Sequence, residues 1–579
     1  MKPVVKKLIL TYVIIVLIKI LFAYFINSPT GFWDEYIYSK LARSFYYNYN
    51  FNVEQNPSPF YPPLYPIVLS IAYIFTNMKS VYFFMKIINA LISTSVIIPA
   101  YLLTKEFLEE KQIIPITILI TLLPINFSFS YYLISENLFY PLFLFSIYFM
   151  YNSLKENSLK NNILVGIFIG LTFLAKNLGL ILILIYFASH ILNRIILKEK
   201  LNIKNLLIGL LFITILISPW LIRNYINFGP TVSGILEETV KDNIESALSS
   251  EKHKGYYLFA LFNWIIIHIT ALAISSGMFF FFSSFFAIRN NNDNNFKKFL
   301  ILSFTSIITF ILILANNSLG PQPTNLPKIF SYFTGRPVLR YIDVLIPIII
   351  IIGAIGLKKY YEQPNKKMLK KLILLSLPFF IISSQLTLTP LFPINNLSLT
   401  HLGIIKTAIN FIIKVPLESE FNPIVYSIML IIFTTLPFLV FFTNKLDLKK
   451  IISIVLVLNI VVLILNFGID IYKTEVWKNN EQLNLGLWFN ENGIKNFNVL
   501  FDIRNEGNHL TDKKALFKEL KEKQYKAQHL ALIGFWMNDN LFFNNINKTE
   551  DIDYIISTYK LNFPIVKKTE NINVYKIEK

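Results

Sequence analysis

The sequence predicts an α-helical protein that crosses a membrane many times and ends in a small α/β domain. Only 15% of the 579 residues are charged and 54% are hydrophobic, whereas soluble domains contain about 25% charged residues. The apolar residues gather in runs of about twenty, the length that crosses the hydrocarbon core of a bilayer. From Tyr472 onward the composition becomes polar. These observations exclude an ordinary soluble enzyme, and the high hydrophobicity excludes a disordered chain.

The uninterrupted apolar segments predict about thirteen membrane-spanning helices. The segment at 258–288 is longer than one span needs, so we expect it to be tilted, kinked at Gly277 or split into a hairpin. The predicted spans lie near residues 8–26, 82–104, 113–130, 138–153, 162–176, 178–193, 205–222, 258–288, 299–315, 339–357, 371–387, 424–443 and 451–469.

The lysines between these spans predict an orientation, because cytosolic loops are enriched in Lys and Arg. No small-residue cleavage site follows the first apolar run, so we expect a retained first helix with a cytosolic N-terminus. This orientation accounts for the net charge of +19, and a nucleic-acid partner is not expected. The lysine-rich loops that it places in the cytosol are 105–112, 154–161, 194–204, 289–298, 358–370 and 444–450.

The same orientation places the longer loops on the outer side of a multi-pass protein of the cell membrane. We expect a membrane domain at 1–470, whose first outer loop is 27–81, and a soluble α/β domain at 471–579. The other long outer loops are 223–257, 316–338 and 388–423.

The C-terminal segment shows alternating helix and strand patterns. A helix is expected at 481–491, stopped by Gly493, and a charged amphipathic helix at 512–525. The segment contains no phosphate-binding glycine loop and no paired-histidine motif, so we expect a structural or acceptor-docking role for it. The predicted strands lie at 498–503, 530–535, 554–557 and 574–577.

Two adjacent carboxylates, Asp34 and Glu35, follow the first span. They stand among Phe32, Trp33, Tyr36 and Tyr38, which do not form a solvated face. Acids at a membrane boundary are costly unless they are paired or functional, although a solvated loop remains an alternative. If the segment is helical, neighbouring side chains point about 100° apart, so the two acids are not expected to share one task.

Further acidic and aromatic candidates lie in the outer loops. Tyr61 begins the sequence Tyr-Pro-Pro-Leu-Tyr-Pro, whose prolines favour a rigid loop that re-enters the membrane, or a simple turn. Glu136 lies in a very short outer turn, where it is either a functional acid or a charge that stabilises a helix N-terminus. Tyr38, Tyr61 and Glu136 are expected near the acceptor or a metal.

Basic residues are sparse on the predicted outer side. Lys176, Arg223, Arg336 and Arg340 are exceptions, and each either binds a phosphate or reaches from the interface to water. A set of carboxylates, cations and aromatic rings at one interface suits sugar transfer from a lipid-phosphate donor. One base takes the proton of the acceptor hydroxyl, and the cations stabilise the charge on the departing phosphate.

The chain resembles the GT-C superfamily of membrane glycosyltransferases, and within it the branch of protein O-mannosyltransferases and the bacterial lipid A aminoarabinose transferase. The resemblance covers roughly residues 1–350 and rests on the order of several weak motifs. They are Asp34-Glu35 with Tyr38 and Ala42, Tyr61-Pro62-Pro63-Leu64-Tyr65-Pro66, Ser135-Glu136, Pro219-Trp220 with Arg223-Asn224-Tyr225, and Arg340-Tyr341 with Pro347.

The resemblance implies a GT-C fold, a polyprenyl-phosphate sugar donor and inversion at the anomeric carbon. It assigns Asp34 as the general base with Glu35 in support, and it leaves a divalent metal possible without naming a ligand. The chain lacks the Trp-Trp-Asp motif of the oligosaccharyltransferase branch, and 388–423 is too short for a β-trefoil domain. The acceptor is therefore open among a lipid, a glycan and a protein.

Other functions are compatible with parts of the pattern. A transporter or flippase for a lipid-linked sugar would place charges near the middle of the membrane on broken helices. Ionisable residues deep inside the predicted spans are nearly absent here, and Lys86 and Asp343, both near predicted helix ends, are exceptions. A scaffold without catalysis would not need the acidic pair. The absence of cysteine excludes disulfides, thiolate zinc sites and a cysteine nucleophile.

Overall fold

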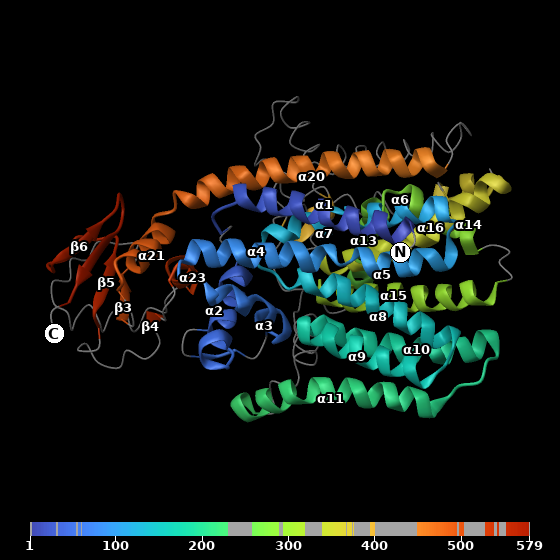
Figure 1. Ribbon diagram of the computed structural model, residues 1–579, viewed down its shortest axis with the longest axis horizontal. Helices are drawn as coiled ribbons and strands as arrows, with labels where there is room; N and C mark the ends of the chain where they lie inside the picture. The colour runs from blue at the N-terminus through green and yellow to red at the C-terminus, as the bar shows by residue number, and fades with distance from the viewer. Residues whose placement is uncertain are drawn as a thin grey trace. The chain divides into compact units, whose positions relative to one another are not determined.

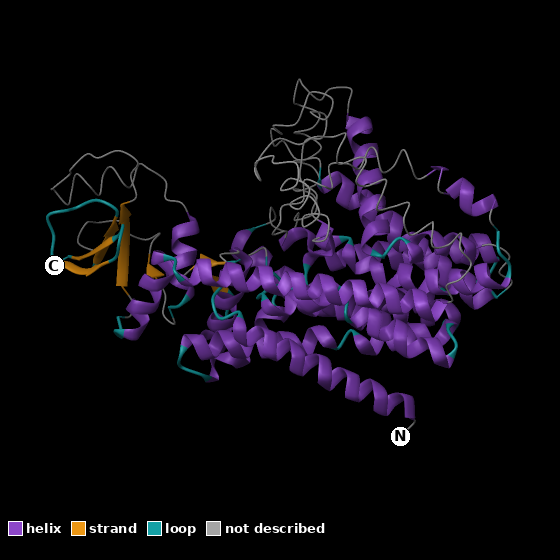
Figure 2. Cartoon of the chain, turned by 90° about the horizontal axis from the view of Figure 1, so that it is seen from above, coloured by secondary structure: helices purple, strands orange, loops and turns teal. Residues whose placement is uncertain are grey.

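Long apolar helices make up most of the computed structural model (Figures 1 and 2). The chain divides into two compact units. The first comprises Met1–Ile18, Leu91–Phe129 and Ser135–Phe467, and the second comprises Lys19–Ala90, Ser130–Ile134 and Gly468–Lys579. The structure describes residues 3–29, 33–53, 56–58, 61–229, 257–288, 293–318, 339–365, 367–372, 374–375, 394–399, 448–494, 497–502, 527–537, 541–542 and 552–577.

The first unit consists of helices. Three helices, α1 (Pro3–Phe25), α4 (Met78–Thr94) and α20 (Leu448–Lys478), run on into the second unit. The helices within the first unit are α5 (Ile97–Phe107), α6 (Glu110–Thr121), α7 (Pro124–Ser128), α8 (Glu136–Lys155), α9 (Leu159–Ala175), α10 (Ile181–Leu197), α11 (Ile203–Phe228), α13 (Tyr257–Ser275), α14 (Phe279–Ile288), α15 (Asn294–Asn317) and α16 (Ile346–Glu362), with short 3-10 turns η3 (Asn177–Leu180), η6 (Leu339–Tyr341), η7 (Asp343–Leu345) and η9 (Ile394–Leu399).

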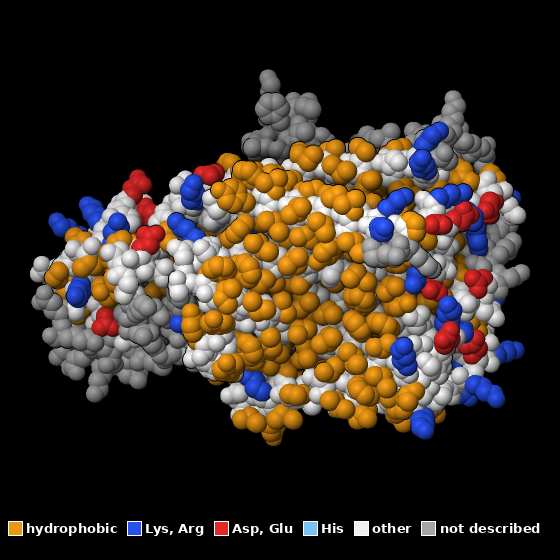
Figure 3. Space-filling view, viewed as in Figure 1, with side chains coloured by type: hydrophobic (Ala, Val, Ile, Leu, Met, Phe, Trp, Pro, Cys, Tyr) orange, Lys and Arg blue, Asp and Glu red, His pale blue; other side chains and the backbone are white. Residues whose placement is uncertain are grey.

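The described helices are those of a multi-pass membrane protein. Seven of them are long and apolar enough to cross a membrane, or up to nine if each of two bent pairs counts as one span. Apolar side chains such as Leu184 and Leu207 are exposed on them, and Figure 3 shows a broad apolar face with Lys and Arg side chains near one end of the helices. The spans expected at 424–443 and over most of 371–387 lie outside the described residues, so the total of thirteen remains a prediction.

The long segment at 258–288 is broken at Gly277. Helices α13 and α14 are bent by 103° at the break, and Gly277 has a φ of +79°, a conformation that glycine adopts without steric cost. Of the tilted, kinked and hairpin arrangements expected for this segment, the structure shows a sharp bend at Gly277. The bend also brings α14 alongside α16.

Helices α14 and α16 pack with their backbones in contact. A Cβ added to Gly356 would lie 1.8 Å from the carbonyl oxygen of Ser283, and one added to Gly353 would lie 2.2 Å from that of Phe280. The hydroxyl of Ser283 also donates to the carbonyl of Gly353 at 2.8 Å. Small residues allow such close approach of helices within membranes.

Replacement of Gly356 by alanine is therefore expected to destabilise the protein by about 2 kcal/mol, because the added methyl group forces the two helices apart. Thermal unfolding of the detergent-solubilised protein measures the effect. The matched control is Gly468→Ala in α20, where an added Cβ meets no described atom within 4 Å. Equal melting temperatures for the two variants would contradict the packing of α14 on α16.

The second unit joins the segment after α1 to the C-terminal part of the chain. Its N-terminal elements are α2 (Trp33–Asn48), a two-stranded pair of β1 (Asn52–Val53) and β2 (Asn56–Pro57), α3 (Leu64–Ser70) and η1 (Ile71–Ile74). The acid-bearing helix α2 and the C-terminal sheet thus belong to one compact unit. The C-terminal elements are α21 (Glu481–Glu491), α23 (Ala527–Phe535), β3 (Phe497–Asp502), β4 (Leu541–Phe542), β5 (Tyr554–Ser557), β6 (Ile565–Lys568) and β7 (Asn573–Lys576).

The C-terminal strands form a five-stranded mixed sheet in the order β4-β3-β5-β7-β6. Strand β3 is parallel to β4 and β5, whereas β7 is antiparallel to β5 and β6. Its core contains Phe489 of α21, Val499, Ile533 of α23 and Val574. The strands expected at 498–503, 554–557 and 574–577 and the helix expected at 481–491 are confirmed, while the helix expected at 512–525 lies outside the described residues.

The strand predicted at 530–535 is wrong, because these residues belong to the helix α23. A short apolar run does not distinguish a strand from a buried helix by its pattern. Residues 531–537 are all buried, and Gly486 of α21 lets the backbone at Ile533 approach closely, since an added Cβ would lie 1.9 Å from that carbonyl oxygen. The segment 530–535 is therefore a buried helix that packs on α21.

Candidate active site

The acidic pair lies at the start of helix α2, so the condition under which the two side chains point in different directions is met. Asp34 and Glu35 both lie in its first turn, where the helix dipole favours negative charge. They nevertheless have different surroundings. Asp34 is half-buried, whereas Glu35 is fully buried. The expectation that the two carboxylates do not share one task is consistent with this difference.

Glu35 is held by groups of its own unit. The backbone N–H of Leu133 donates to its Oε1 at 3.1 Å, and the hydroxyl of Tyr82 donates to the same atom at 3.3 Å. Tyr82 also lies under the ammonium group of Lys86, 4.3 Å from the ring centre. A buried carboxylate with these partners positions the start of α2 and is poorly exposed to a substrate.

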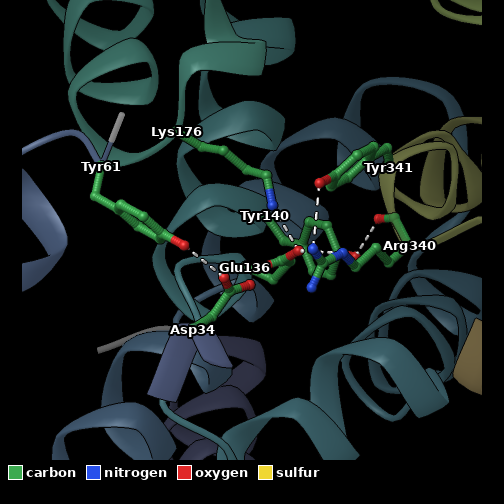
Figure 4. Close-up of polar contacts among 7 residues, drawn as sticks. All are labelled: Asp34, Tyr61, Glu136, Tyr140, Lys176, Arg340 and Tyr341. Atoms are coloured by element: carbon green, nitrogen blue, oxygen red, sulfur yellow. Dashed lines mark hydrogen bonds and ion pairs between the residues drawn. The ribbon is translucent and has the colours of Figure 1, made fainter. Parts of the chain in front are cut away.

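Asp34 is oriented by a tyrosine of the Tyr-Pro-Pro-Leu-Tyr-Pro sequence. The hydroxyl of Tyr61 donates to Oδ1 of Asp34 at 3.0 Å (Figure 4). The ring of Tyr38 packs edge-on against Tyr61 at 5.1 Å and against Tyr65 at 4.8 Å. Pro63 precedes α3 directly. Tyr61 therefore lies just before that helix and Tyr65 within it. The predicted neighbours Asp34, Tyr38 and Tyr61 are thus brought together.

The first unit contains a buried group of one acid and two cations. Lys176 Nζ lies 2.5 Å from Oε1 of Glu136, and Arg340 Nε lies 3.3 Å from the same oxygen (Figure 4). The ring of Tyr341 lies 4.5 Å from the Lys176 ammonium, and its hydroxyl accepts from Arg340 at 3.2 Å. Tyr140 donates to the carbonyl of Arg340 at 2.6 Å. We call Glu136, Lys176 and Arg340 the ion triad.

The ion triad carries one net positive charge. Glu136 is 1% exposed and Arg340 is 9% exposed. Burial alone would raise the pKa of Glu136, but the charges of Lys176 and Arg340 hold this pKa below its ordinary value. With Glu136 ionised, the two cations are only partly neutralised. A partly compensated cation pair is suited to binding an anion.

The structure describes one further predicted cation, Arg223. Arg223 lies near the end of α11, where its Nη1 donates to Asn224 at 2.8 Å and its guanidinium lies 4.8 Å from the ring of Trp220. Both of these contacts lie within α11. Arg336 lies outside the described residues.

Among the described residues, no group of three or more His, Asp or Glu side chains is arranged to hold a metal ion. Two buried charges in the spans also have protein partners. Lys86 donates to the carbonyls of Ala23, at 2.9 Å, and Ile26, beyond the end of α1. Both oxygens of Asp343 accept from Ser398 at 2.9 Å. These contacts give Lys86 and Asp343 structural roles.

Comparisons with known proteins bear on the fold. Residues 61–222 match the model of a family described as dolichyl-phosphate-mannose-protein mannosyltransferase. The crystal structure of ArnT from Cupriavidus metallidurans bound to undecaprenyl phosphate superposes with a TM-score of 0.55 at 11% identity, over 98% of this chain and 97% of ArnT. Apo ArnT gives a TM-score of 0.51 at 10% identity, over 99% and 98% of the two chains. The chain has the GT-C fold.

The GT-C resemblance predicted from the motifs is thereby confirmed. The apo oligosaccharyltransferase of Archaeoglobus fulgidus superposes with a TM-score of 0.44 at 12% identity over 94% of this chain and 69% of that one. No curated protein sequence matches the chain. The matched family segment contains Tyr61, Glu136 and Lys176 and covers less than half of the chain.

Several residues of these clusters were not predicted from the sequence. Tyr82 and the N–H of Leu133 hold Glu35, and Tyr140 holds the Arg340 backbone. No local signal identifies them, because aromatic residues are common throughout this chain. Tyr341 could have been proposed, since it follows Arg340 directly and an aromatic ring is a frequent partner of a cation.

Proposed function

We propose that the protein transfers a sugar, with inversion at the anomeric carbon, from a polyprenyl-phosphate donor to an acceptor hydroxyl at the outer face of the membrane. The observation that carries this proposal is the division of the acidic pair: Asp34 is half-buried and oriented by Tyr61, while Glu35 is buried and bonded. The GT-C fold supports it, as do the undecaprenyl phosphate named for ArnT and the mannosyltransferase description of the family.

In the proposed reaction, Asp34 acts as the general base. Its carboxylate takes the proton of the acceptor hydroxyl while the acceptor oxygen attacks the anomeric carbon. The bond between that carbon and the phosphate oxygen breaks, and its electron pair leaves with the lipid phosphate. Lys176 and Arg340 are proposed to stabilise the charge on that phosphate. Arg223 and Arg336 are retained as further candidates for the donor site.

The experiment that tests this function measures transfer of radiolabelled sugar from polyprenyl-phosphate donors in membranes that contain the protein. Donor-dependent labelling of an acceptor is expected, and its absence from membranes without the protein is the control. A protein that moves the labelled donor across vesicle membranes but forms no labelled product would instead be a flippase.

We also propose a cytosolic N-terminus and an extracytoplasmic C-terminal sheet. Exposed lysines at the α10–α11 connection, such as Lys200, support this orientation. Because the chain lacks cysteine, single introduced cysteines report sidedness without background. Glu570→Cys, at an exposed position after β6, should react with a membrane-impermeant maleimide in intact cells. Lys200→Cys should react only after permeabilisation, and the reverse pattern would overturn the orientation.

A further inference from the structure

A cavity of about 740 Å³ in the second unit lies where apolar helices end. Its walls come from the C-terminal end of α1, the start of α4, the end of α20, helix α21 and Trp536, which follows α23. None of the described residues assigned a role in the proposed reaction lines this cavity. Its position at three helix termini corresponds to a membrane–water boundary, where Tyr and Trp side chains are typically found.

The charged lining of the cavity favours an anion. Among the described lining residues, Lys79, Lys86 and Lys478 face the cavity together with one acid, Glu475. The Lys86 ammonium is bound by backbone carbonyls, but Lys79 and Lys478 are exposed. The ion pair of Lys478 with Glu475 is long, at 3.8 Å, and exposed, so it is weak. Two lysines are thus available to a phosphate or another acidic group.

The rest of the lining favours a polyol attached to an apolar chain. Amide side chains of Asn27, Asn479 and Asn484 supply both donors and acceptors, and the indole of Trp536 forms part of the wall. Tyr24 and Phe25 at the end of α1 line the cavity and are more than half exposed, so an apolar tail would find a surface there.

We propose that this cavity binds the anionic, hydroxyl-bearing head group of a lipid acceptor, an inference that rests on the proposed function and specifies its acceptor. One contact links the cavity to the acidic helix. Tyr82 lines the cavity, donates to Glu35 and packs 5.7 Å from Trp536. Glu35 adjoins Asp34, the proposed base. Helix α21 and Trp536 give the C-terminal part of the unit a direct role in holding the acceptor.

The proposal is tested by equilibrium binding of radiolabelled phosphatidylinositol to the full-length protein in neutral detergent. This lipid combines a phosphate with a six-membered polyol, and phosphatidylcholine, which lacks both the net charge and the polyol, serves for comparison. Lys79→Glu with Lys478→Glu should weaken phosphatidylinositol binding by at least about tenfold, because each lysine near a membrane contributes about 1 kcal/mol with an acidic lipid. Asn484→Trp, which fills the cavity without a change of charge, should also weaken it.

The matched control is Lys560→Glu with Lys568→Glu, which makes the same charge change at exposed positions of the sheet region outside the cavity lining. It should bind phosphatidylinositol as the wild type does. Equal losses in both double variants, or equal binding of the two lipids by the wild type, would overturn the proposal. So would a labelled transfer product that is a protein. Intact lipid binding without any sugar transfer would instead refute the proposed function, so the two failures are distinguishable.

Discussion

Replacement of Asp34 by asparagine is expected to lower sugar transfer by about 1,000-fold, because the variant cannot accept the proton of the acceptor hydroxyl. Asparagine has nearly the same shape, and its side-chain oxygen can still accept the hydrogen bond that Tyr61 donates at 3.0 Å. The variant should therefore keep its melting temperature. The measurement is the initial rate of label transfer from the polyprenyl-phosphate donor, per amount of folded protein.

Glu35→Gln is the matched comparison for this variant. Glu35 is fully buried and accepts hydrogen bonds from Leu133 and Tyr82, so loss of its charge should lower stability more than it lowers the rate per folded molecule. Tyr61→Phe should fall between the two in rate, because the base keeps its chemistry and loses its orientation. Full activity in Asp34→Asn would refute the assignment of the base. A stable but inactive Glu35→Gln variant would indicate that Glu35 is the base and that Asp34 is the positioning residue.

Lys176→Gln is expected to lower transfer by about 100-fold through loss of one positive charge at the donor phosphate. The same variant should also be less stable, since Glu136 is 1% exposed and loses the partner at 2.5 Å. These two effects must be separated. The double variant Lys176→Gln with Glu136→Gln removes both charges but leaves Arg340, which is 9% exposed, without its carboxylate partner. Transfer is therefore compared per amount of folded protein.

The rate of that double variant decides what the ion triad does. If Lys176 contacts the donor phosphate, transfer per folded molecule stays low. If Lys176 only neutralises Glu136, transfer per folded molecule returns, and its role in donor binding is refuted. The control is Lys155→Gln, because Lys155 forms a more exposed ion pair with Glu106 at 2.8 Å outside the ion triad. Its activity should stay close to that of the wild type.

The sequence by itself determined the features that depend on local composition and spacing. Apolar runs of span length predicted the membrane helices, and a kink at Gly277, where φ is +79°, was one of three arrangements predicted for 258–288. The motif order predicted the GT-C fold that the comparison with ArnT confirms. Helix geometry predicted that Asp34 and Glu35 do not share one task, whereas the choice of Asp34 as base came from the GT-C resemblance.

Only the tertiary structure decided which distant residues meet. Glu136, Lys176 and Arg340 come from α8, the end of α9 and η6, and no local pattern encodes that pairing. The burial of Glu35 depends on Tyr82 and Leu133, and the helix α23 at 527–535 is packed on α21. In each case the arrangement is stabilised by packing and desolvation between segments far apart in the chain. The hydrophobic pattern of a single segment carries no information about these contacts.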